Sequence, residues 1–153
     1  EADEMTYDLH IIIRFEIERD LFAGKIRVMD LPNVWNDKME AYLGVVPPNN
    51  GKEGVLQDIH WSGGMFGYFP TYSLGNIAAA QFWATMRRVM PDMDAKMEQG
   101  DFSGILGWLR QNVHAHGRMF PRDELLKRAT GKVLGTEDYA QYLNNKYSKL
   151  YGL

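Results

Sequence analysis

Residues 3–22 read DEMTYDLHIIIRFEIERDLF and decide the fold class of this chain. Their apolar side chains recur at helical spacing in two stripes: Leu9, Ile12, Ile13, Ile17 and Leu21, and then Ile11, Phe15 and Phe22. The β-branched run of three isoleucines would suit a strand if taken alone, but the length of the whole pattern favours a helix. Because a helix that is apolar on two sides is normally buried, the sequence predicts a long core helix over residues 3–22.

Polar side chains lie between these two apolar stripes. Asp3, Tyr7, His10 and Arg14 are spaced 4, 3 and 4 residues apart, which aligns them on one side of the predicted helix. Such a strip is more often solvated, or holds a structural ion pair, than part of a functional site. Both interpretations fit the spacing.

The rest of the chain also reads as helices separated by glycine and proline. Gly24 is suited to end the first helix, and Asp30-Leu31-Pro32 is suited to begin the next, since proline is tolerated in a first turn. A loop over residues 43–52 follows. Further helices are expected over residues 74–90, 92–98, 102–114, 121–130 and 136–151. The expected class is all-α, with residues 1–153 forming a single helical unit.

Composition restricts the class of protein. The 153 residues are 45% hydrophobic and 24% charged, as in ordinary soluble globular proteins. The net charge of −3 argues against a nucleic-acid partner, and no apolar run approaches the ~20 residues that span a membrane. The absence of cysteine excludes disulfides and thiolate metal sites, and it fits a cytoplasmic protein. His114 and His116 do not share a helix face and have no supporting ligand nearby, so no metal site is predicted there.

Residues 54–76, GVLQDIHWSGGMFGYFPTYSLGN, are the least periodic part of the chain. The segment combines five glycines with several aromatic rings and one histidine. Glycine lets the backbone approach other groups closely, and the rings bring hydrogen-bond donors. A long irregular segment of this kind is usually functional. An aromatic loop that fills a helical core explains the composition equally well. Within the segment, residues 54–61 could form a helical turn.

Residues 54–61, GVLQDIHW, resemble the GxxQDxHW motif of the carboxypeptidase Taq family of zinc metallocarboxypeptidases. FGYFPTYSLGN and the opening EADEMTYDLHIIIRFEIE are also similar to that family, and Glu1-Ala2-Asp3 matches the tail of its IRxxAD motif. The resemblance covers essentially all of this chain but only the C-terminal part of a much longer enzyme.

The resemblance implies a mostly helical, cleft-containing metallopeptidase that removes C-terminal residues from peptides and forms homodimers. It also implies zinc, or another divalent metal, bound by an HExxH motif that this sequence does not contain. We therefore expect an excised C-terminal fragment that binds no metal natively and has no activity alone. We further expect it to expose an apolar surface and self-associate. The rival hypothesis is a helical scaffold or oligomerisation domain without chemistry.

The resemblance also indicates candidate site residues. A metal-activated water attacking a peptide creates an oxyanion that needs positioned donors, and His60 and Tyr72 are the catalytic candidates. Tyr68 is an alternative to Tyr72. Gln57 and Asp58, close to the histidine in sequence, are substrate-binding candidates together with Tyr68, and Asp58 would either accept from His60 or hold a backbone turn. Two further substrate-binding candidates remain: Asp3 as the last residue of the cut motif, and Arg14 as a weak substitute for the motif's missing arginine.

Overall fold

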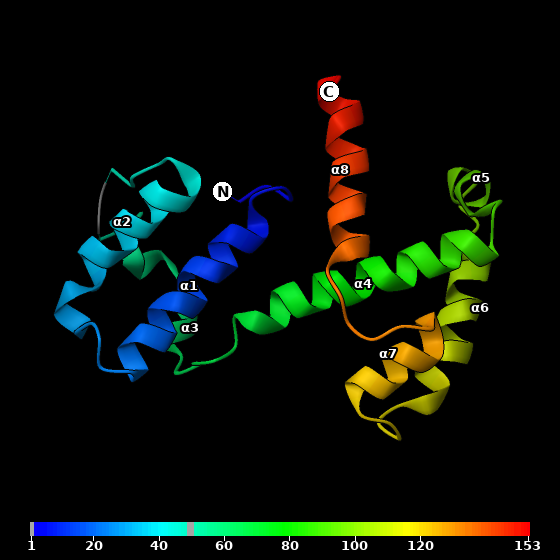
Figure 1. Cartoon of the computed structure of the whole chain (residues 1–153), viewed down its shortest axis with the longest axis horizontal. Helices are drawn as coiled ribbons and strands as arrows, with labels where there is room; N and C mark the ends of the chain where they lie inside the picture. The colour runs from blue at the N-terminus through cyan, green and yellow to red at the C-terminus, as the bar shows by residue number, and fades with distance from the viewer. Residues whose placement is uncertain (1, 49–50) are drawn as a thin grey trace. The chain divides into compact units, whose positions relative to one another are not determined.

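The computed structural model describes residues 2–48 and 51–153, and every regular element in those residues is helical (Figure 1). The all-α prediction is confirmed. The chain divides into two compact units, Glu1–Leu74 and Gly75–Leu153, so the prediction of a single helical domain stays a prediction. Glu1 of the predicted motif tail and Asn49-Asn50 of the predicted loop lie outside the described residues. None of the described helices is both long and apolar enough to cross a membrane.

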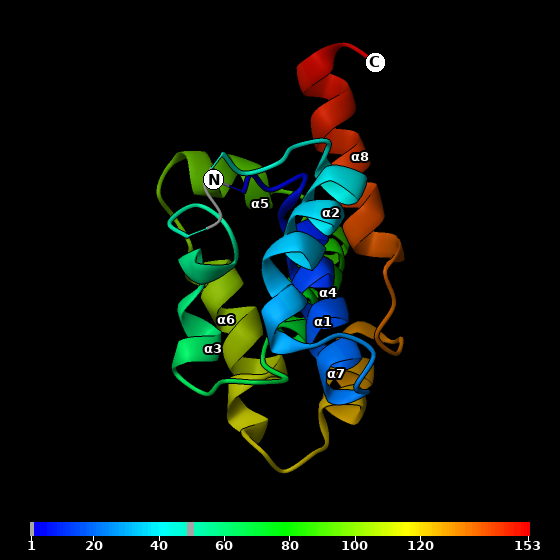
Figure 2. The same ribbon diagram turned by 90° about the vertical axis from the view of Figure 1, so that its left-hand side faces the viewer.

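The first unit begins with two long helices that lie side by side (Figures 1 and 2). α1 spans Tyr7–Phe22 and α2 spans Leu31–Leu43, with a 3-10 turn over Val28–Asp30 between them. The predicted end of α1 at Gly24 is confirmed, because Gly24 has a left-handed φ of 68°, and Gly44, inside the predicted loop, ends α2 with a φ of 69°.

The prediction that the first helix begins at Asp3 is wrong, because α1 begins at Tyr7. The carboxylate of Asp3 accepts hydrogen bonds from both the backbone N–H and the hydroxyl of Thr6, each at 2.8 Å. An aspartate that bonds the local backbone in this way favours a turn over a continued helix. Asp3 therefore belongs to a turn, and the helix begins at Tyr7.

Neither of the two predicted apolar stripes of α1 is completely buried in the core of the first unit. Ile13 and Ile17 pack with Trp35, Met39 and Val55. Ile11 of the second stripe is also buried, whereas the large apolar side chains of Ile12, Phe15 and Phe22 are exposed. The other covered strip of α1 contains Arg14 and Glu18, whose polar groups are paired with residues of the 54–69 segment.

The segment expected to be irregular over residues 54–76 is partly helical. A 3-10 turn spans Val55–Gln57 and α3 spans Ile59–Ser62, which confirms the helical turn predicted within residues 54–61. α4 spans Pro70–Val89, so it begins four residues before the predicted start at Leu74. Proline has a fixed φ and no N–H to lose, which suits it to the first position of a helix.

The second unit contains the rest of α4 together with four further helices: α5 (Met93–Glu98), α6 (Ser103–Asn112), α7 (Arg122–Thr130) and α8 (Glu137–Tyr151). The predicted helices match these bounds closely, except that α6 ends at Asn112 and a separate 3-10 turn spans His114–His116. Inside this unit the buried amide of Gln81 donates to the carbonyl of Val133 at 2.9 Å and accepts from the backbone N–H of Gly135 at 3.2 Å. These bonds attach the segment before α8 to α4.

Candidate active site

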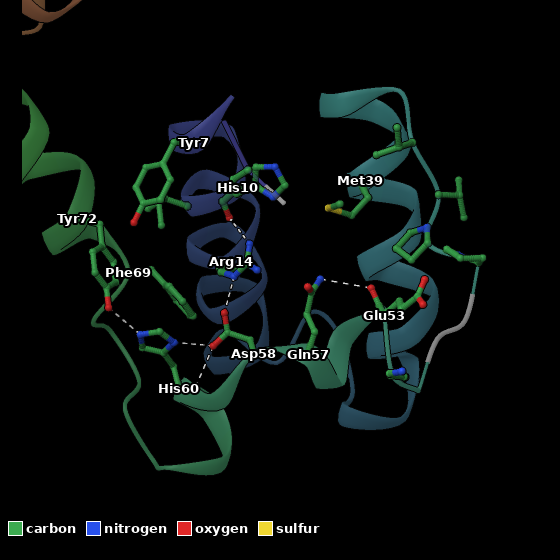
Figure 3. Close-up of a pocket in the computed structure, with 17 residues that line it drawn as sticks. Tyr7, His10, Arg14, Met39, Glu53, Gln57, Asp58, His60, Phe69 and Tyr72 are labelled. Atoms are coloured by element: carbon green, nitrogen blue, oxygen red, sulfur yellow. Dashed lines mark hydrogen bonds and ion pairs between the residues drawn. The ribbon is translucent and has the colours of Figure 1, made fainter. Parts of the chain in front are cut away.

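The first unit contains an open cleft of about 700 Å³ (Figure 3). One side of the cleft is polar and is formed by side chains from α1, α3 and the start of α4: Tyr7, His10, Arg14, Asp58, His60 and Tyr72. The opposite side comes from α2 and the segment after it; it carries the apolar side chains of Met39, Val45, Val46, Pro47 and Pro48, with Lys52 and Glu53 beside them. The cleft therefore combines positioned hydrogen-bonding groups with an apolar wall, as small-molecule and peptide sites do.

Asp58, His60 and Tyr72 form a continuous row of hydrogen bonds along the polar side (Figure 3). The Nε2 atom of His60 lies 2.9 Å from the Tyr72 hydroxyl, and its Nδ1 atom lies 2.6 Å from Oδ1 of Asp58. The same Oδ1 accepts the backbone N–H of His60 at 2.9 Å, which makes Asp58 the N-cap of α3. Both functions considered for Asp58 are therefore present at once: it bonds the His60 ring and also holds the local backbone.

Arg14 extends this row from α1. Its Nε donates to Oδ2 of Asp58 at 2.7 Å, and its Nη1 donates to the carbonyl of His10 at 2.8 Å. The guanidinium lies 4.8 Å from the ring centroid of Trp35, within range of a cation–π contact. The structure thus turns Arg14 onto Asp58, and its predicted role as a substrate-carboxylate anchor stays a prediction.

The charges of this row follow from its contacts. Burial raises the pKa of Asp58, but the backbone N–H of His60 and the guanidinium of Arg14 outweigh that effect and hold the pKa below its ordinary value. Asp58 is therefore ionised at neutral pH and can only accept, so Nδ1 of His60 must carry a proton. Burial, followed by the neighbouring phenols of Tyr68 and Tyr7, raises the pKa of Tyr72. Tyr72 thus keeps its hydroxyl proton.

The other predicted residues are placed less directly. The Tyr68 ring stacks near His60 with centroids 5.9 Å apart, but Tyr68 is not part of the cleft lining, whereas Tyr72 is. Gln57 lines the cleft, and its amide donates to the carbonyl of Glu53 at 3.3 Å. Asp3 is exposed and is engaged by Thr6. The roles of these three residues in substrate binding stay predictions.

Glu18 is a site-supporting residue that the sequence pattern did not reveal. The residue is only 3% exposed. Oε1 accepts from Nε1 of Trp61 and Oε2 accepts from the backbone N–H of Gly67, each at 2.9 Å. These two donors adjoin His60 and Tyr68 in sequence, so Glu18 holds both ends of the intervening loop. Extending the strip of Tyr7, His10 and Arg14 by four residues would have found it.

The polar groups of the cleft do not fit a metal ion. Across residues 2–48 and 51–153, no three His, Asp or Glu side chains gather in a way that could hold one. Both ring nitrogens of His60 and both carboxylate oxygens of Asp58 are already engaged by protein groups. His60 and Asp58 therefore act in this cleft as hydrogen-bonding groups.

The fold and the cleft together describe an all-helical protein in which a hydrogen-bonded histidine and tyrosine lie on one wall of an open cleft. Residues 1–147 match the family model for the carboxypeptidase Taq (M32) metallopeptidases, and the chain belongs to that family. The resemblance carried by the GVLQDIHW motif is thereby confirmed.

Curated relatives and solved structures carry the same family name or activity. The chain is 49% identical over 151 residues to carboxypeptidase 1 of Bacillus subtilis and 44% identical over 152 residues to thermostable carboxypeptidase 1 of Thermus thermophilus. Each match covers 99% of this chain and 30% of the relative, so the chain spans about a third of the length of these relatives.

Two solved structures agree with these sequence matches. The M32 carboxypeptidase of Deinococcus radiodurans matches with a TM-score of 0.95 and 45% identity, covering 100% of this chain and 31% of that chain. Metallocarboxypeptidase 1 of Trypanosoma cruzi matches with a TM-score of 0.91 and 48% identity, covering 96% of this chain and 31% of that chain.

Proposed function

We propose that this chain forms one wall of the active-site cleft of a cytoplasmic, metal-dependent carboxypeptidase that removes C-terminal amino acids from peptides. Membership of the family and the carboxypeptidase relatives support this activity. The observation that carries the assignment of the wall is the 2.9 Å contact between His60 and Tyr72 at the cleft.

The metal belongs to another part of the enzyme in this proposal. Zinc, or another divalent ion, is bound by an HExxH motif on a segment that this chain does not include. The enzyme acts as a homodimer. The residues described here supply binding and hydrogen bonds, and the chain by itself is inactive.

The proton arrangement of the row explains how His60 and Tyr72 act together. When His60 is neutral, its Nδ1 holds the only ring proton, so the Tyr72 hydroxyl donates to Nε2. When His60 takes up a second proton, Nε2 becomes a donor to the Tyr72 oxygen, and the hydroxyl proton of Tyr72 turns toward the cleft. Only in this second arrangement does Tyr72 donate to substrate while it keeps its contact with His60.

Asp58 fixes the ring in both arrangements, because its Oδ1 lies 2.6 Å from Nδ1–H and the ring then keeps Nε2 facing Tyr72. The oxyanion that forms when a peptide carbonyl is attacked would then receive the Tyr72 hydroxyl proton as a hydrogen bond. Because the donor is held in place before the reaction, little reorganisation opposes it.

A chimera tests this proposal. In it, the chain replaces the matching segment of the B. subtilis relative. We expect His60→Ala and Tyr72→Phe each to lower kcat by about 10²–10³, the usual cost of removing an oxyanion donor, with a much smaller change in KM. Steady-state hydrolysis of a blocked dipeptide measures both constants.

Controls within the same chimera separate chemistry from folding. His114→Ala and Tyr151→Phe alter residues of the same types in the second unit and should leave kcat unchanged. The isolated chain with added zinc or cobalt should show no turnover above buffer. An unchanged kcat in either site variant, with circular dichroism intact, would mean that the residue only packs the wall. If the chimera does not fold, the same substitutions are made at the aligned positions of the relative.

A further inference from the structure

We propose that Arg14 is a positioning residue: it holds Asp58 so that the His60 ring keeps its proton on Nδ1 and presents Nε2 to Tyr72. The effect on catalysis rests on the proposed function, whereas the effect on the His60 ring does not. Arg14 therefore acts through Asp58 and does not serve as an anchor for the substrate carboxylate.

Arg14 is itself held firmly. Its side chain is 11% exposed. Nη1 donates to the carbonyl of His10 one turn earlier in α1, and the guanidinium faces the rings of Trp35 and Phe69 at 4.8 and 5.7 Å. Because these contacts fix the plane of the guanidinium, the direction of its Nε–H toward Asp58 is fixed as well.

The carboxylate of Asp58 depends on this contact. Its side chain is 9% exposed, and an ionised group that has lost most of its water needs a compensating charge. Arg14 supplies that charge by donating to Oδ2 of Asp58. The other oxygen, Oδ1, is left to accept from the backbone and ring N–H groups of His60. Without Arg14 the carboxylate would be free to rotate away or to take up a proton.

The position of Asp58 in turn decides the tautomer of His60. With the proton on Nε2, the unprotonated Nδ1 would face an ionised oxygen at 2.6 Å, and two lone pairs would repel each other. The Nδ1–H tautomer removes that repulsion and leaves Nε2 as the acceptor for Tyr72. The ring of Phe69 lies 4.8 Å from that of His60 and supports the same ring position.

Substrate anchoring is a poorer use of Arg14. Two of its donating nitrogens are occupied by Asp58 and by the His10 carbonyl. The negative charge of Asp58 also cancels much of its attraction for a second carboxylate. A lysine at this position would retain a positive charge, but it would lose the planar geometry that serves both acceptors.

Nuclear magnetic resonance of the histidine rings tests the proposal on the chain as it is. Long-range ¹H–¹⁵N spectra report which ring nitrogen is protonated, and solvent-exchange measurements report how well that proton is held. We expect His60 as the Nδ1–H tautomer with a slowly exchanging proton. In Arg14→Lys that proton should exchange about tenfold faster or more, as losing a charge-assisted hydrogen bond implies.

The matched control is Arg19→Lys, which alters an exposed arginine that lies on the same helix and pairs with Asp20. It should leave the His60 signal unchanged. An Nε2–H tautomer in the parent chain, or unchanged exchange in a folded Arg14→Lys variant, would overturn the proposal. If Arg14→Lys does not fold, Asp58→Asn replaces it and should give a mixture of His60 tautomers. A pure Nδ1–H tautomer with slow proton exchange in Asp58→Asn would overturn the proposal equally.

Kinetics in the chimera then separate positioning from anchoring. Arg14→Lys should lower kcat at nearly constant KM, whereas an anchor for the substrate carboxylate would show a raised KM at constant kcat and would refute the positioning role. The two proposals fail differently: an unchanged kcat in His60→Ala rejects the proposed function, and an unchanged His60 spectrum in Arg14→Lys rejects this one.

Discussion

Glu18 shows how one buried side chain can set the shape of a loop. Its two oxygens accept one N–H each, from Trp61 and Gly67, and the loop between those donors joins His60 to Tyr68. Both donors are uncharged. The carboxylate is stabilised by two well-placed hydrogen bonds, and each would be costly to leave unmade in a buried position.

Replacing Glu18 by glutamine should therefore destabilise the first unit. The amide keeps one accepting oxygen and turns an NH₂ group toward the second donor, so one buried N–H loses its partner. We expect the free energy of unfolding to fall by about 1–3 kcal/mol, measured by denaturant titration. Glu40→Gln, at an exposed position of α2, should stay within about 0.5 kcal/mol of the parent. Equal stability of the two variants would show that Glu18 is not needed for the loop.

For the strip of α1 that carries Arg14, the sequence predicted which residues share a face but not that this face is partly buried. Helical spacing placed Tyr7, His10 and Arg14 together, and the structure places them along one cleft. The sequence also favoured a solvated strip or a structural ion pair over a functional site, because the apolar stripes on either side were the ones predicted to be buried. The strip is partly buried because Arg14 and Glu18 find partners 44 and 43 residues away in Asp58 and Trp61. Pairing over such separations leaves no local pattern.

At the scale of elements, helix ends were the most predictable feature. Gly24 follows α1 with positive φ, as predicted, and Gly44 follows α2 in the same conformation. The start of α4 was misplaced because Ser73, Gly75 and Asn76 are weak helix formers and hid the first turn. Proline at position 70 was the available signal, since it suits a first helical position.

Replacing two glycines of the second unit by alanine should change its stability in opposite directions. Gly107 lies within α6 with ordinary φ, and a methyl group added there would meet no other atom within 4 Å, whereas Gly131 follows α7 with φ of 87°. Gly107→Ala should stabilise by about 0.5–1 kcal/mol, because alanine loses less backbone entropy. Gly131→Ala should destabilise by about 1–2 kcal/mol, because a Cβ clashes in the left-handed conformation.

Thermal unfolding followed by circular dichroism measures both glycine variants. The pair serves as its own control, since the same methyl group is added to two open positions of one unit. Shifts of the same sign would contradict the assigned conformations of α6 and the end of α7.

At the scale of the whole molecule, the chain leaves much apolar surface uncovered. Phe22 and Phe66 are 72% and 49% exposed, and their rings meet edge to face with centroids 5.4 Å apart. Val28 and Met29, between α1 and α2, are exposed as well. Large exposed apolar side chains mark surfaces that bind other proteins.

We expect the isolated chain to self-associate through this surface. Burying two phenylalanine rings would contribute roughly 1.5–3 kcal/mol for each ring, enough to favour association at high protein concentration. Light scattering over a concentration series should give a mass above that of a monomer, and the double variant Phe22→Ser with Phe66→Ser should lower it. Leu150→Ser, which removes an equally exposed apolar side chain from α8, should not. A parent chain that stays monomeric would refute the prediction, and a lower mass in Leu150→Ser alone would move the contact to α8.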